Sequence, residues 1–184
     1  ASIEKLDRIC RKLNLSEKDS ILEIGTGWGS FAIHAAKNYG CNITTTTISD
    51  AQYEYAKNKI LEEGLDDKIT LLNKDYRNLS GTFDKIVSIE MIEAVGHEYV
   101  PLFFQEVSKL LKKDGLFALQ GITYNDHNFD DYKHSVDFIK KYIFPGSCLI
   151  SISQITNAIK KKTDLSIVNL EDITMHYATT LHKW

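Results

Sequence analysis

The 184-residue chain is 43% hydrophobic and 26% charged, a balance that supports one sizeable buried core and leaves little room for a second domain. Its formal net charge of -3 provides no basic field for a polyanion, so we expect no nucleic-acid partner. The cysteines Cys10, Cys41 and Cys148 form no C-x-x-C pair, which argues against a disulfide framework and against zinc, and we predict no metal site.

The two ends of the chain lack the signals that open or close most domains. The sequence begins directly on an amphipathic helical pattern at Ile3, Leu6 and Ile9, and it stops at Trp184 without a turn signal. We therefore expect a piece of a longer protein, truncated at both ends. No apolar stretch approaches the roughly 18 residues of a membrane-spanning helix, and no signal-peptide pattern is present, so we expect a cytoplasmic location.

Strand-like and helical stretches alternate after a leading helix in residues 1–19. The predicted strands cover 20–24, 42–48, 69–73, 85–89 and 116–122, and the predicted helices cover 30–39, 49–64 and about 99–111. Alternation of this length is typical of parallel crossovers. We therefore predict an α/β fold in a single domain, with a doubly wound, mostly parallel sheet in a core that covers residues 20–122.

The pattern changes beyond Tyr124. A polar loop is followed by an aromatic helix at about 136–144, a Pro145-Gly146 turn and another helix. We expect residues 123–164 to form a helical lid over the sheet. Residues 165–184 would then supply the last strand, at 165–173, and the start of a following helix.

The first predicted strand ends in a glycine-rich turn from Glu23 to Gly29, with the sequence EIGTGWG. Glycines let the backbone turn tightly and let a ligand approach without Cβ atoms in the way. A nicotinamide dinucleotide site would place its third glycine one residue later and an acid at the end of the second strand, where only threonines stand at 44–47. Glu23 suits the ammonium and sulfonium groups of S-adenosylmethionine, so the turn favours that cofactor, with a ligand-free tight turn as the alternative.

Polar side chains follow the other predicted strands, at the edge where an open parallel sheet binds its ligands. Together with the turn they predict the cofactor site. Its candidate residues are Glu23, Gly25, Gly27, Trp28, Gly29, Thr47, Ile48, Gln52, Asp75, Tyr76 and Arg77. For Trp28 we favour packing of the turn against the neighbouring helix over a wall of the cofactor site.

Six stretches of the chain resemble the cyclopropane-fatty-acyl-phospholipid synthase family. They are ILEIGTGWG at 21–29, TTISDAQ at 46–52, DYR at 75–77, EMIEAVGH at 90–97, DFIKKYIFPG at 137–146 and HYATTL at 176–181. The run from Glu90 and the YIFPG run are far more specific than the glycine turn, which many methyltransferases share. The resemblance extends over nearly the whole chain and implies a class I S-adenosylmethionine methyltransferase with a Rossmann-like fold.

The resemblance also implies a reaction, in which a methyl group is added to a cis double bond of a phospholipid acyl chain. The resulting carbocation would lose a proton to a bound bicarbonate and close a cyclopropane ring. Carried over position by position, Glu93 and Tyr177 would organise this base together with Gln120 and the backbone near Ile89 and Ile122. The expected partner is phospholipid with unsaturated acyl chains, which the protein would meet peripherally at the membrane surface. Whether it also forms a homo-oligomer stays an open question.

Two positions depart from the family pattern. The family's histidine falls on Gln120, which can donate a hydrogen bond but cannot relay a proton. The family's cysteine would lie before Ala1, outside this sequence.

Other interpretations remain open at this point. Glu93 could have a structural role, because a helix N-terminus favours a carboxylate there. Tyr177 could be a half-buried core residue and not a catalytic one. The aromatic run at 138–144 suits ordinary core as well as the wall of an acyl tunnel. A small-molecule amine N-methyltransferase would share the same turns, and a catalytically silent cofactor-binding or lipid-binding protein is the second rival. One carbocation also leads to a cyclopropane, a methyl branch or an exocyclic methylene.

Overall fold

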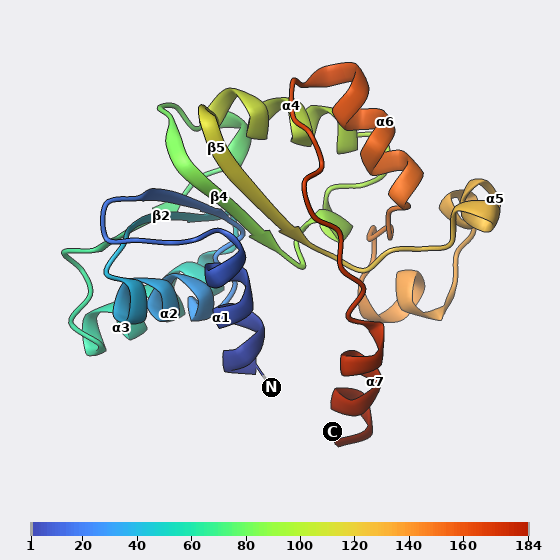
Figure 1. The fold of residues 1–184 in the computed structure, drawn as a ribbon. Helices are drawn as coiled ribbons and strands as arrows, with labels where there is room; N and C mark the ends of the chain where they lie inside the picture. The colour runs from blue at the N-terminus through green and yellow to red at the C-terminus, as the bar shows by residue number, and fades with distance from the viewer. Residues whose placement is uncertain (1, 184) are drawn as a thin grey trace.

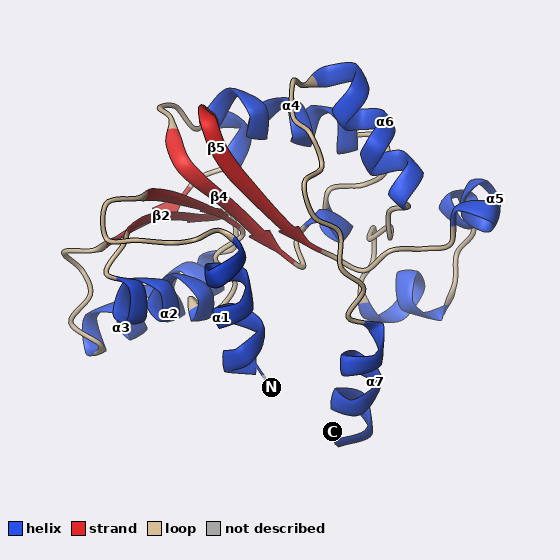
Figure 2. Cartoon of the chain, viewed as in Figure 1, coloured by secondary structure: helices blue, strands red, loops and turns tan. Residues whose placement is uncertain are grey.

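Five parallel strands form the centre of the fold in the computed structural model, which describes residues 2–183 (Figures 1 and 2). The strands are β1 Ser20–Ile24, β2 Asn42–Thr47, β3 Ile69–Asn73, β4 Phe83–Ile89 and β5 Leu111–Gln120. Their order is β3-β2-β1-β4-β5, so the topological switch point lies between β1 and β4. The predicted α/β fold with a doubly wound parallel sheet is confirmed.

Helices cover both faces of this sheet. Helices α1 Ser2–Lys12, α2 Ser30–Tyr39 and α3 Asp50–Glu62 lie on one side, and α4 Val100–Leu110 and α6 Ile152–Lys162 lie on the other (Figure 1). Gly40 ends α2 in the left-handed region at φ 71°, as a C-terminal glycine cap does. Ser49 caps α3 by accepting the backbone N–H of Gln52. The predicted helices at 30–39, 49–64 and 99–111 are therefore confirmed within two residues at each end.

Each face of the sheet has its own hydrophobic core. Phe31, Ala35 and Ile43 belong to the cluster under α1 and α2. Phe103 and Phe104 of α4 are buried in the opposite cluster, with ring centroids 5.5 Å apart in an edge-to-face contact. Burial of one such ring contributes about 1.5–3 kcal/mol. The sheet between these two cores is the rigid support of everything at its carboxyl edge.

Residues 123–164 extend from the sheet as short helices. These are a 3₁₀ turn at Asp126–Asn128, α5 Phe129–His134, a π-helical turn at Ile139–Ile143, and α6. The predicted aromatic helix at 136–144 is reduced to the π-helical turn, and its side chains face outward, with Phe138 66% and Phe144 64% exposed. The backbone N–H of Cys148 donates to the carbonyl of Glu93 at 2.9 Å and ties this region to the end of β4. Its function as a lid stays a prediction.

The predicted strand at 165–173 is wrong. This segment is a loop between α6 and α7 Thr174–Lys183, drawn in tan in Figure 2. Its apolar residues have strand propensity, but within residues 2–183 its backbone joins no strand ladder, and Val168 is 82% exposed. A cavity of about 570 Å³ lies between the segment, α1 and β5. The predicted helix after it is present as α7.

None of the helices within residues 2–183 is long and apolar enough to cross a membrane.

Candidate active site at the carboxyl ends of the strands

The glycine turn crosses from β1 to the end of β2. The backbone N–H groups of Gly25 and Thr26 both donate to the carbonyl of Thr46 at 3.0 Å. Gly25 has φ 97°, and a Cβ placed there would lie 2.9 Å from the Met91 side chain. Gly27 has φ 52°, and a Cβ there would meet nothing within 4 Å. The turn is therefore packed at its first glycine and open at its second, where a ligand can approach the backbone.

Glu23 lies beneath this turn and is only 2% exposed. The Thr45 hydroxyl donates to its carboxyl at 2.6 Å, and the Thr26 hydroxyl lies 2.7 Å from the Thr45 hydroxyl. Burial raises the pKa of Glu23 to about 8, although the hydrogen bond from Thr45 acts in the opposite direction. At pH 7 this acid is therefore neutral, and it is linked to the turn through the hydroxyls of Thr45 and Thr26. Its contact with a cofactor stays a prediction.

The ends of β2 and β3 supply further candidate residues. The Thr47 hydroxyl donates to the Gln52 side chain at 2.8 Å, and the neighbouring Ile48 is 75% exposed. The Arg77 guanidinium donates to both oxygens of Asp75, at 3.0 Å from Nε and 2.6 Å from Nη2. The hydrogen bond from Arg77 lowers the pKa of Asp75, which holds this carboxylate ionised. These side chains form an ordered polar rim beside the turn.

Two aromatic candidates pack differently. Tyr76 contacts Phe103 edge-to-face at 5.6 Å and belongs to the core under α4. Trp28 contacts Tyr55 of α3 edge-to-face at 5.2 Å and is 57% exposed. The packing of Trp28 against the neighbouring helix supports the interpretation that we favoured.

Three donors converge on one oxygen of Glu90, which directly follows β4. Lys5 of α1 donates from Nζ at 2.9 Å, and Gln120 at the end of β5 donates from Nε2 at 2.9 Å. The Tyr177 hydroxyl of α7 donates to the same oxygen. Gln120 Nε2 also donates to the Tyr177 oxygen at 2.8 Å. The structure thus brings together two predicted catalytic residues, Gln120 and Tyr177, around a third residue that was not on that list.

The charges in this cluster depend on its hydrogen bonds. Burial alone would raise the pKa of Glu90, but the hydrogen bonds from Tyr177 and Lys5 outweigh it and lower that pKa. Burial and the bond to Glu90 raise the pKa of Tyr177. Burial opposes the charge on Lys5, yet its contacts with Glu90 raise the pKa of the ammonium overall. An ionised carboxylate, a protonated lysine and a neutral phenol therefore share one site.

Glu93 occupies a neighbouring position in the 3₁₀ turn Ile92–Ala94. Its Oε1 accepts the backbone N–H of Ile122 at 2.6 Å, while its buried Oε2 has no hydrogen-bond partner among the described residues. Burial raises the pKa of Glu93 against the effect of the Ile122 N–H. At Gly121 a Cβ would lie 2.7 Å from Ile92 and 3.3 Å from the Glu93 carboxylate, so only glycine allows this close approach.

The predicted catalytic set is therefore brought to one edge in two groups. Gln120 and Tyr177 bind Glu90, whereas Glu93 binds the backbone of Ile122. Ile89 pairs with Gln120 in the β4–β5 ladder. The sequence did not predict Lys5 or Glu90 as residues of the catalytic site. The position of Glu90 directly after the fourth strand could have indicated it, whereas no sequence feature indicated Lys5.

The chain is similar to known proteins in sequence and in fold. The sequence profile described as mycolic acid cyclopropane synthetase matches residues 1–184. The chain belongs to this family. The tuberculostearic acid methyltransferase of Mycobacterium tuberculosis is 36% identical over 184 residues, which are 100% of the chain and 43% of that protein. The cyclopropane-fatty-acyl-phospholipid synthase of Escherichia coli is 37% identical over 182 residues, 98% of the chain and 44% of that protein.

A solved member of the family has the same fold. Mycolic acid cyclopropane synthase CmaA1, complexed with SAH and CTAB, gives a TM-score of 0.89 at 27% identity and covers 100% of this chain and 67% of that one. The chain spans less than half the length of the two curated relatives. Membership of the cyclopropane synthase family confirms the resemblance noted in the sequence.

The described donors do not fit the bicarbonate that the family resemblance implies. The Tyr177 hydroxyl donates to Glu90, and the Gln120 amide donates to Glu90 and to the Tyr177 oxygen. The Ile122 N–H donates to Glu93. Glu93 Oε2 and Gln120 Oε1, the buried side-chain atoms of this site that lack a partner among the described residues, are both acceptors. An anion needs donors, and here it would face two glutamates, so this arrangement does not suit a bound bicarbonate.

Proposed function

We propose that this chain is the core of an S-adenosylmethionine-dependent methyltransferase that modifies the cis double bond of an unsaturated phospholipid acyl chain, with a cyclopropane as product. The protein would act peripherally at the membrane surface. The observation that carries the proposal is the buried Oε2 of Glu93, which has no hydrogen-bond partner within residues 2–183, at the edge of the sheet that also carries the open glycine turn. The names of the two relatives above, a tuberculostearic acid methyltransferase and a cyclopropane-fatty-acyl-phospholipid synthase, support the acyl substrate.

The glycine turn is the part of the site that would hold the cofactor. Gly27 leaves space over the backbone, and the ordered pairs Thr47–Gln52 and Asp75–Arg77 border it. When bound, S-adenosylmethionine supplies an electrophilic methyl group. Because the switch point lies between β1 and β4, a ligand at the turn would lie next to the loop that carries Glu93.

The acceptors near β4 and β5 match the charge that develops on the lipid. Addition of a methyl cation equivalent to a double bond leaves a positive charge on an acyl carbon, and a preorganised carboxylate stabilises that charge in a site poor in water. Glu93 Oε2 has no competing hydrogen-bond partner within residues 2–183, so it can serve this function and accept a proton. Loss of a proton from the added methyl group then lets the C–H electron pair close the three-membered ring.

The test uses trideuteromethyl S-adenosylmethionine and vesicles of monounsaturated phospholipid, with lipid mass spectrometry as readout. A lipid that gains one carbon and retains two of the three deuteriums shows that the transferred methyl group loses one hydrogen, as ring closure requires. Retention of all three would replace the cyclopropane with a methyl branch. Glu93→Gln should keep cofactor binding and lose methyl transfer by about 100-fold or more, since it removes the carboxylate at the reacting carbon. Glu98→Gln, an exposed glutamate on the same loop, is the matched control.

The unpartnered acceptors also suit an ammonium group, which favours the amine methyltransferase as the second candidate. A competition assay with small amine acceptors separates the two. Methylated amine with unlabelled lipid would contradict the lipid proposal, and cofactor binding without transfer to either acceptor would leave the silent-binder interpretation.

A further inference from the structure

A strained backbone places Glu90 in its cluster. Glu90 has φ 51°, one of two non-glycine residues with positive φ in the described chain. L side chains rarely adopt this region, and such residues gather at functional sites when the surrounding structure holds them in place. Its backbone N–H donates to the carbonyl of Gln120 at 2.8 Å, so β5 fixes the turn that carries the side chain.

The side chain of Glu90 then orders the two residues beside it. Its Oε1 accepts from the Tyr177 hydroxyl and from Gln120 Nε2, while Gln120 Nε2 also donates to Tyr177. The phenol proton and the amide hydrogens are thereby directed into the cluster. The carbonyl oxygen of Gln120 is left without a partner among residues 2–183, as is Glu93 Oε2. Reversal of the Gln120 amide would set its carbonyl against the Glu90 carboxylate, which excludes that orientation.

The Lys5 ammonium forms an ion pair with the Glu90 carboxylate. Its nitrogen lies 2.9 Å from the Glu90 carboxylate and 3.4 Å from the Tyr177 oxygen. Lys5 stands in α1 and Tyr177 in α7, so the cluster connects the first and last helices of the described chain to the ends of β4 and β5. Figure 1 shows α1 and α7 on the same side of the sheet edge.

We propose that Glu90, with Lys5 as its counter-ion, is a positioning residue of the methyl-transfer site, which orients Tyr177 and Gln120 so that acceptor oxygens face the reacting lipid. The inference rests on the proposed function. Neither residue touches the substrate in this proposal; both act through Tyr177 and Gln120.

The variants Glu90→Gln and Lys5→Met test this pair in the whole protein. Both should lower kcat for lipid methylation about tenfold and change the KM for S-adenosylmethionine by less than about twofold, because misplacement of the acceptors affects the reacting centre and not the cofactor turn. Lys5→Arg, which keeps the positive charge, should restore most of the rate.

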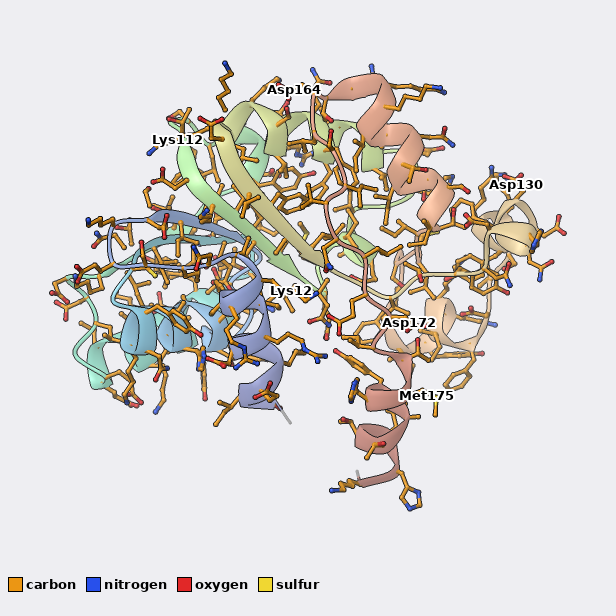
Figure 3. All side chains as sticks on the ribbon, in the orientation of Figure 1. Lys12, Lys112, Asp130, Asp164, Asp172 and Met175 are labelled. Atoms are coloured by element: carbon orange, nitrogen blue, oxygen red, sulfur yellow. The ribbon has the colours of Figure 1, made fainter. Side chains whose placement is uncertain are left out.

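A second lysine–carboxylate pair provides the matched control. Lys112 binds Asp84 at 2.8 Å, at the amino end of the sheet, and Figure 3 shows Lys112 at the end of β5 away from Asp172 and α7. Lys112→Met removes an ion pair of similar length and exposure and should leave kcat unchanged. Equal losses in Lys112→Met and Lys5→Met would mean that both act only through folding, and would overturn the inference.

The pH titration of Tyr177 is a measurement that a loss of fold stability alone would not change. In protein labelled with ¹³C at the tyrosine ring, Tyr177→Phe identifies the Tyr177 signal, and its pH titration is followed by NMR. Glu90→Gln should shift this titration to lower pH, because the phenol no longer donates to a carboxylate. An unchanged titration overturns the inference.

The two proposals fail in different ways. Wild-type lipid methylation with full kcat in Glu90→Gln overturns the positioning inference and leaves the proposed function standing. No lipid methylation by the wild type overturns the proposed function, and the inference with it.

Discussion

The ends of β1 and β4 are each followed by a residue with nearly the same positive φ, and the two residues differ in what they do. Gly27 has φ 52° and Glu90 has φ 51°, and each lies shortly after one of the two strands that border the switch point. At Gly27 the glycine makes this conformation easy and leaves open space over the backbone. At Glu90 the same conformation costs about 1–2 kcal/mol, and the side chain it places binds three donors. One end is shaped to admit a ligand and the other to fix side chains.

The glutamates at these two ends also differ in charge. Glu23 is buried with a hydroxyl group as its side-chain donor, and its pKa rises to about 8. Glu90 loses water as well, but a lysine, a phenol and an amide surround it and its pKa is lowered. Burial favours the neutral acid in both, so the partners decide which one ionises.

The largest effect that tests this contrast is the pH dependence of stability. Folded Glu23 keeps its proton up to pH about 8, whereas the unfolded chain releases it near the ordinary value of 4.5. Between these values the folded state binds the extra proton, so Glu23 makes the free energy of unfolding fall as pH rises, by up to about 1.4 kcal/mol per pH unit. Glu23→Gln should remove this slope in urea denaturation series. If the free energy of unfolding changes with pH in the same way in the wild type and in Glu23→Gln, then Glu23 is ionised in the folded protein.

A smaller loss is expected for Thr45→Val. Valine keeps the shape of the side chain, but it leaves the Glu23 carboxyl without the hydroxyl that donates to it and the Thr26 hydroxyl without its acceptor. A buried polar group without a partner costs about 1–3 kcal/mol, measured as the change in free energy of unfolding. Thr70→Val on the exposed face of β3 is the control and should change stability by less than about 0.5 kcal/mol. Equal effects at both positions would refute a structural role for the Glu23–Thr45–Thr26 chain.

The smallest effect on stability is expected for Gly27→Ala, at about 1 kcal/mol, because the new Cβ meets nothing within 4 Å and only the backbone is strained. Its effect on cofactor affinity should be larger, about tenfold by isothermal titration calorimetry, since a methyl group would fill the space where the ligand approaches. Gly64→Ala, with φ 64° and equally open surroundings after α3, imposes similar strain away from the strand ends. Unchanged affinity in Gly27→Ala would place the cofactor elsewhere.

Much of the fold was predictable because its signals are local. Gly40 and Ser49 mark helix boundaries within a few residues of sequence, and the β-branched run before Ser49 marks β2. The segment 165–173 shows the limit: its composition favours a strand, yet a strand needs a partner edge, and composition does not say whether one is available. The aromatic run around Phe138 likewise has core composition and an exposed position.

The candidate site was predictable in part for the same reason. Residues at the end of a strand or shortly after it, such as Gln120 and Glu93, could be placed at one edge from the strand order alone. The contact between Lys5 and Glu90 joins residues 85 positions apart, and it depends on where α1 packs, which no short motif records. The charge of Glu23 was inferred from its place before the glycine turn, whereas its protonation depends on its burial in the folded chain.

The outer edge of β5 pairs with no strand of residues 2–183, so β5 is an edge strand of the sheet. A strand edge offers backbone N–H and C=O groups to any further segment of suitable length. A strand added there would run beside Gln120 and leave Gly27, two strands further in, undisturbed. A segment added at β5 would therefore extend the sheet without changing the backbone of the glycine turn.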